Sequence, residues 1–176
     1  MHGAQAAHMT RVRHLREAFA SANERLVARL RGATDEAAER HVQNGWSASQ
    51  IGWHVATVST RFAGLISGDL TGTQPLPDSF CERPWGEIVA SIPDRLQAPP
   101  SSHPPPAVRR TDAVAALEAS GTKMARAFDA LTSERGARLG ITSAIVGTIN
   151  VYQLAEWATA HIARHNKQAK RVLGEG

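Results

Sequence analysis

The stretch that decides the fold lies near the end of the chain and reads Ala155-Glu156-Trp157-Ala158-Thr159-Ala160-His161-Ile162-Ala163-Arg164-His165-Asn166-Lys167-Gln168. It contains no glycine or proline and is rich in alanine and long-chain residues, so it predicts a helix. Steps of three and four residues place one set on a single helical face: Leu154, Ala158, His161, His165, Gln168 and Val172. We expect this face to point inward, although it carries two histidines.

The two histidines are four residues apart, which brings their Cβ atoms to roughly 5–6 Å from each other. Two neutral imidazoles at this spacing can chelate one divalent ion. Chance alone gives about 0.4 such pairs for eight histidines in 176 residues, so surface or hydrogen-bonded histidines are an open alternative. A metalloprotease helix needs Glu directly after the first His, and Ile162 stands there, which excludes that mechanism. A third ligand must come from elsewhere in the chain.

Composition predicts a folded protein with one domain over residues 1–176, since 42% of the residues are hydrophobic and 20% are charged. The formal net charge of +4 is modest, and the densest basic cluster is Arg11, Arg13 and Arg16. Such spacing is typical of the solvated face of a helix, so we expect no nucleic-acid partner. No apolar run reaches the length of a membrane span, so we expect no membrane association.

Cysteine usage indicates a reducing compartment, because the single Cys81 allows no intrachain disulfide. Together with the lack of an apolar signal core, this predicts a cytoplasmic protein. Cys81 lies in a proline-rich loop with no histidine beside it in sequence, so we do not expect a nucleophile there.

Two helices are expected in the first part of the chain. The first runs from about Met9 to Leu30, with Gly32 as its C-cap. The second begins after Ser47, which forms a capping box with Gln50, and ends around residues 67–68. Their apolar stripes are Val12, Leu15, Phe19, Ala22, Leu26 and Leu30 in the first, and Ile51, Val55, Val58, Phe62 and Leu65 in the second.

The middle of the chain is proline-rich, because all nine prolines fall between Pro75 and Pro106. This excludes a long helix, although a short one is possible over residues 85–92, and residues 97–106 should be extended. So long a connection suggests a functional or partner-facing loop whose role the sequence leaves open. It would also allow the flanking helices to run parallel.

Two more helices are expected after the proline-rich segment. The third begins at Thr111-Asp112, and Gly121 in its middle suggests a close helix contact. The fourth is capped by Thr148 or Asn150 and reaches about residue 173. No strand pair with convincing alternation is visible between them. Four helices of this length predict an all-α fold, a four-helix bundle with a long proline-rich crossover between its second and third helices.

His54 is the candidate for the third ligand, since it lies between Ile51 and Val58 on the second helix and leans toward the core. In a bundle it can face the two histidines of the last helix. A buried imidazole without a partner costs roughly 1–3 kcal/mol, which three imidazoles sharing one ion avoid. Gln50 and Arg61 lie on the same side of the helix as His54.

Several motifs together resemble the DinB/YfiT-like superfamily. The first two are Asn44-Gly45-Trp46-Ser47 followed by Ile51-Gly52-Trp53-His54, and His161-x-x-x-His165-x-x-Gln168; the third is Arg95-Leu96-Gln97-Ala98-Pro99-Pro100 with Pro105-Pro106, similar to the connector of the YfiT-like branch. The resemblance covers about residues 12–173. It implies a bundle of up-down-down-up connectivity and a divalent ion, zinc or nickel, held by three histidines that match His54, His161 and His165.

The resemblance also implies chemistry, because characterised members are thiol-dependent transferases or isomerases and others are described as metal-dependent hydrolases. We therefore predict a metal-dependent enzyme that activates a small thiol for attack on a small-molecule substrate. Hydrolysis and a non-catalytic bundle stabilised by metal are the alternatives. Gln50, Arg61 and Gln168 lie within one or two turns of the predicted ligands and are candidates for orienting substrate. A homodimer is also predicted, while the metal, the thiol and the substrate stay open.

Overall fold

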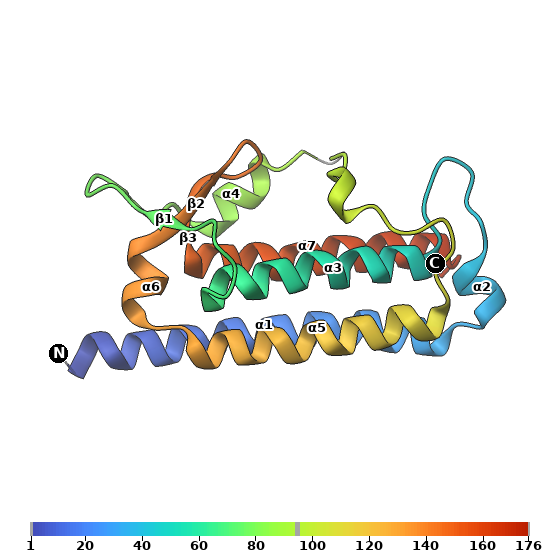
Figure 1. Cartoon of the computed structure of the whole chain (residues 1–176), viewed down its shortest axis with the longest axis horizontal. Helices are drawn as coiled ribbons and strands as arrows, with labels where there is room; N and C mark the ends of the chain where they lie inside the picture. Colours follow the sequence, from blue (N-terminus) through green and yellow to red (C-terminus); the bar gives the residue numbers. More distant parts are fainter. Residues whose placement is uncertain (1, 94–95, 176) are drawn as a thin grey trace.

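Four long helices make up most of the protein, and the computed structural model describes residues 2–93 and 96–175. The long helices are α1 (His2–Gly32), α3 (Ala48–Ser67), α5 (Arg110–Ala130) and α7 (Val151–Val172). Figure 1 shows α3 and α7 in one layer and α1 and α5 in the other. Followed by colour, α1 and α7 run in one direction and α3 and α5 in the other, so the connectivity is up-down-down-up.

The core lies between the two layers, and small residues bring the helices close together. A Cβ atom added at Gly52 of α3 would lie 2.6 Å from Leu30 of α1 and 3.3 Å from Ala113 of α5. At Gly121 the added atom would lie 2.8 Å from the Asn23 side-chain amide, which confirms the predicted close contact. The apolar stripes predicted for the first two helices are buried apart from Val58, which is partly exposed.

The helix starts follow the predicted caps in two of three cases. Ser47 and Gln50 form the expected capping box at α3, and Asn150 forms one with Gln153 at α7. The cap predicted at Thr111 is wrong, because α5 begins at Arg110. The Arg110 backbone N–H instead donates at 2.8 Å to a carboxylate oxygen of Glu39 in α2 (Asp35–Glu39), so another element satisfies this helix end.

The first helix is longer than predicted, since α1 already includes residues 2–8. These residues contain no helix breaker other than Gly3. His8 is buried, and its Nδ1 atom lies 2.6 Å from the Tyr152 hydroxyl of α7. Tertiary packing against α7 therefore extends the helix beyond what its own apolar stripe indicates.

A small antiparallel sheet was not predicted and corrects the expectation of no strands. It consists of β1 (Gln74–Pro75), β2 (Leu139–Ser143) and β3 (Gly147–Asn150), with β2 in the centre. A turn helix, α6 (Ser133–Arg138), precedes the hairpin, and Gly147 takes a φ of 74° where the hairpin turns back. β-branched residues on both strands favour this pairing, but the run is too short for its alternation to stand out.

The proline-rich segment crosses from the end of α3 to the start of α5 over the α3/α7 layer (Figure 1). It carries the predicted short helix, α4 (Trp85–Ser91), and a 3₁₀ turn, η1 (Pro100–Ser102). That turn corrects the expectation that residues 97–106 are extended throughout. Arg95, which belongs to the connector motif, lies outside the described residues.

Candidate metal centre

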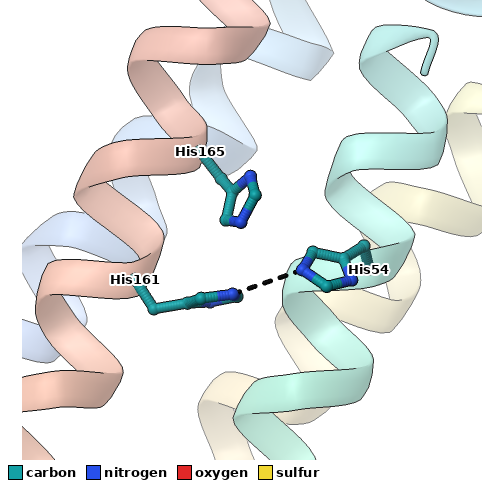
Figure 2. A group of neighbouring side chains, drawn as sticks. All are labelled: His54, His161 and His165. Atoms are coloured by element: carbon teal, nitrogen blue, oxygen red, sulfur yellow. Dashed lines mark hydrogen bonds between the residues drawn. The ribbon is translucent and has the colours of Figure 1, made fainter. Parts of the chain in front are cut away.

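Three histidines from two helices converge in the α3/α7 layer (Figure 2). His54 comes from α3, and His161 and His165 come from α7. Each offers a ring nitrogen within 4.8 Å of those of the other two. The ring centroids are 4.5 Å apart for the pair on α7, while His54 lies 5.2 Å from His161 and 4.8 Å from His165. The structure therefore brings together the three predicted ligands.

The histidines of α7 lie beside the buried stripe of that helix rather than on it. The buried residues of α7 beyond its first turn are Ala155, Ala158, Ile162 and Ala169, whereas both histidines, Gln168 and Val172 are partly exposed. The face of α7 that points inward is therefore centred nearer to Ile162 than the sequence predicts. His54 on α3 is 3% exposed, so it is the most deeply buried of the three histidines, and the α7 pair lies closer to the surface.

Hydrogen bonds fix the orientation of two of the three rings. His54 Nδ1 lies 2.8 Å from the Ser102 backbone carbonyl, which accepts only, so Nδ1 carries the proton and the Nε2 lone pair is left for the cluster. His165 Nδ1 lies 2.8 Å from Gln168 Oε1, with the same consequence. His161 Nδ1 is buried and has no hydrogen-bond partner among the described residues.

The Nε2 atoms of His54 and His161 lie 3.2 Å apart. Two bare lone pairs repel at this separation, so either one nitrogen donates a proton to the other or a cation lies between them. Nitrogen ligands at 2.0–2.1 Å on a tetrahedral zinc ion are about 3.4 Å apart. The observed separation matches that requirement.

All three imidazoles are held neutral. Burial is the main cause in each case, and it lowers the pKa of His54, lowers that of His165 to about 4, and lowers that of His161 well below its ordinary value. A proton on a neighbouring cluster histidine, and the charge of Arg164, would lower the pKa of the α7 pair further, and a proton on His103 would lower that of His54. Neutral imidazoles are the form that binds transition metals, so the donor set fits zinc or nickel.

Aromatic side chains enclose the cluster on two sides. The Trp46 ring lies 4.8 Å from His54 and 5.9 Å from His103 of the crossover. Phe62 lies 6.4 Å from His161 and 5.3 Å from Trp157. These rings pack against the histidines and reduce their contact with water, which lowers the effective dielectric constant around the cluster.

The three predicted substrate-orienting residues have different positions. Gln168 contacts a histidine directly through the bond to His165. Gln50 uses its amide oxygen in the capping box and its amide nitrogen on two crossover carbonyls. Arg61 is exposed, seven residues or roughly 10 Å along the helix from His54. A role in orienting substrate stays a prediction for all three.

Sequence reasoning missed two neighbours of the cluster, Ser102 and His103. Both belong to the crossover, and Ser102 acts through its backbone carbonyl, for which no residue type is a signal. Glu156 also lies on α7, and burial raises the pKa of its carboxyl group. Its charged neighbours are Arg11 and Glu82, and it is not part of the histidine cluster.

The family model of the DinB superfamily matches residues 18–169 of the chain. The chain belongs to the DinB superfamily. The superfamily is metal-binding, and the three histidines of this DinB protein supply a group that could hold the ion. The all-α fold predicted from the sequence is confirmed by the same match and by the helical architecture. No curated protein matches the chain.

The structure also bears on the predicted partners. Among the described residues no helix has both the length and the apolar character needed to cross a bilayer. In the basic cluster near the start of the chain, Arg11 pairs with Glu82 and Arg16 pairs with Asp129. The expectation of no nucleic-acid partner stays a prediction.

Proposed function

We propose that this DinB protein is a metal-dependent enzyme that holds one divalent ion, zinc or nickel, through His54, His161 and His165 and acts on a small-molecule substrate with a small thiol as cosubstrate. The observation that carries the proposal is the convergence of three neutral imidazoles within 4.8 Å. An ion held by three neutral ligands keeps its 2+ charge and favours the anionic form of a thiol or water entering its open position.

The residues around the histidines support an open catalytic position rather than a closed structural one. No Asp, Glu or Cys joins the three histidines among the described residues, so the protein supplies three ligands there and not four. Gln168 orients the His165 ring, and Phe62 and Trp46 shield the neighbouring rings from water. Each of these contacts preorganises the ligands before substrate arrives.

Thiol transfer is favoured over hydrolysis because no carboxyl group joins the histidine cluster within residues 2–93 and 96–175. A water nucleophile needs a group to accept its proton, and the nearest half-buried carboxyl on α7, that of Glu156, has Arg11 and Glu82 as its charged neighbours. A thiol has a pKa of about 8.5 and needs no such base once it is next to a cation. We accordingly propose an S-transferase or isomerase acting in the cytoplasm as a single domain over residues 1–176.

The test uses metal-free protein reconstituted with zinc or nickel, a chloro-dinitrobenzene electrophile and a panel of small thiols. We expect turnover that depends on both metal and thiol and is lost in His54→Ala. His41→Ala is the matched control, because His41 is an exposed histidine outside the cluster. Turnover of an ester or amide without thiol would favour a hydrolase. No turnover in either assay, with metal bound, would favour a non-catalytic bundle in which the ion only links α3 to α7.

A further inference from the structure

The proline-rich crossover reaches the histidine cluster through one backbone atom. The carbonyl oxygen of Ser102 accepts a hydrogen bond from His54 Nδ1 at 2.8 Å. Both residues are buried, with 3% of His54 and 5% of Ser102 exposed. A hydrogen bond protected from water in this way is a strong constraint on the ring, because losing it would leave a buried polar atom unsatisfied.

The carbonyl is held in place from two directions. Within the crossover, the backbone N–H and the hydroxyl of Ser102 both donate to the Pro99 carbonyl, at 2.9 and 3.0 Å, and close the η1 turn. From α3, the side-chain amide of Gln50 donates to the carbonyls of Pro105 and Pro106 at 2.9 and 3.1 Å. Gln50 lies one helical turn before His54, so α3 anchors the crossover at two successive points on one face.

We propose that Gln50 is a positioning residue for His54: by fastening the crossover to α3, it holds the Ser102 carbonyl against Nδ1 and thereby presents Nε2 to the ion. The part of this inference that concerns metal affinity rests on the proposed function. The part that concerns the ring does not, since the hydrogen bond joins two groups of the protein itself.

The physical basis is the choice between the two neutral tautomers of imidazole. A carbonyl at Nδ1 selects the form with the proton on Nδ1, which leaves the lone pair on Nε2, and it raises the basicity of that nitrogen. Without the carbonyl the proton could reside on Nε2 and block it as a ligand. Loss of such a partner typically weakens metal binding about 10–100-fold.

Gln50→Glu is the most informative variant, because a carboxylate keeps the oxygen that accepts from the Ser47 backbone N–H at 2.9 Å. It loses both donors to the crossover and places negative charge against two carbonyls. Ser47→Ala is the matched control, since it removes the Ser47 hydroxyl from the same capping box and leaves the amide of Gln50 on the crossover. Ser102→Ala acts from the other side, by removing the hydroxyl that helps to close η1.

Two measurements test the proposal, both on full-length protein. Long-range ¹⁵N–¹H spectra of the metal-free protein report which ring nitrogen of His54 is protonated, and zinc affinity is obtained by competition with a chelator. In Gln50→Glu we expect His54 to shift from Nδ1–H toward a mixture of tautomers and zinc to bind about 10–100-fold more weakly than in Ser47→Ala. Ser102→Ala should change the His54 tautomer and the zinc affinity in the same direction. It provides the test if Gln50→Glu does not fold.

The two readouts separate this inference from the proposed function. An unchanged His54 tautomer in both variants, with zinc affinity equal to that of Ser47→Ala, overturns the positioning role even if the wild-type protein binds zinc. If the wild-type protein binds no metal but the His54 tautomer still shifts in Gln50→Glu, the positioning role is supported and the metal-dependent function is refuted.

Discussion

The acid sensitivity of the metal-free protein should depend on the cluster histidines, and His165 offers the clearest case. Burial lowers the pKa of its imidazole to about 4, against 6.5 in an unfolded chain. Between these values the unfolded chain binds a proton that the native protein does not. Stability contributed by the neutral ring is therefore fully present above pH 6.5 and is lost as the pH falls toward 4.

The two pKa values set the size of the effect. Proton linkage from 6.5 to about 4 makes the native state lose about 2.5 kcal/mol of unfolding free energy between pH 7.5 and pH 4.5 on account of His165 alone. Other groups titrate over this range, including carboxylates and the other two cluster histidines. A comparison between wild-type protein and His165→Gln largely removes their contribution, because both proteins carry those groups.

The assay is urea unfolding at several pH values, followed by helical circular dichroism with a chelator present. The wild-type protein should lose about 2.5 kcal/mol more than His165→Gln as the pH is lowered from 7.5 to 4.5. The glutamine has no proton to bind in this range, so its curve should be flatter. Parallel curves for the two proteins would refute the reasoning, since they would mean that the ring of His165 titrates equally in the folded and unfolded chains.

Four further outcomes are expected. His161→Ala should sharply lower the metal content of protein purified without a metal-affinity column while His41→Ala does not, and equal retention by elemental analysis would contradict the ligand assignment. Removal of metal by a chelator should lower the melting temperature, because the ion binds only the native state, and an unchanged value after verified removal would count against a stabilising ion. Zinc binding at pH 6.0 should release clearly fewer protons than the roughly two that three imidazoles of ordinary pKa would release; calorimetry in buffers of different ionisation enthalpy measures this number. Light scattering should give a homodimer, and a mass near the 18.9 kDa of one chain at micromolar concentration would overturn that prediction.

The sequence predicted the parts of the fold that depend on local patterns. Apolar periodicity located the four long helices, the pairing of Ser47 with Gln50 gave the start of α3, and Asn150 was one of the two caps expected for α7. The candidate ligands could also be predicted: His161 and His165 from their spacing, and His54 because an imidazole between Ile51 and Val58 on an apolar stripe needs a polar partner from another element.

The parts that could not be predicted depend on contacts between distant segments. The start of α5 is set by Glu39 of α2, and the His54 ring is set by a carbonyl of the crossover. The hairpin β2–β3 is too short to show a clear alternation. Packing against neighbouring helices decides that α7 turns its Ile162 side inward. Apolar residues lie on more than one face of this helix, so the sequence pattern alone does not determine which face is buried.

The two helices that supply the histidines are also far apart along the chain, since His54 and His161 are separated by 107 residues. Bringing such distant segments together is a slow part of folding, because the loop-closure entropy is lost before the contacts form. If the histidines meet only after the rate-limiting barrier, an ion bound to them stabilises the native state and not the transition state. Metal should then prolong the lifetime of the folded chain by slowing its unfolding, while the rate of folding stays nearly the same.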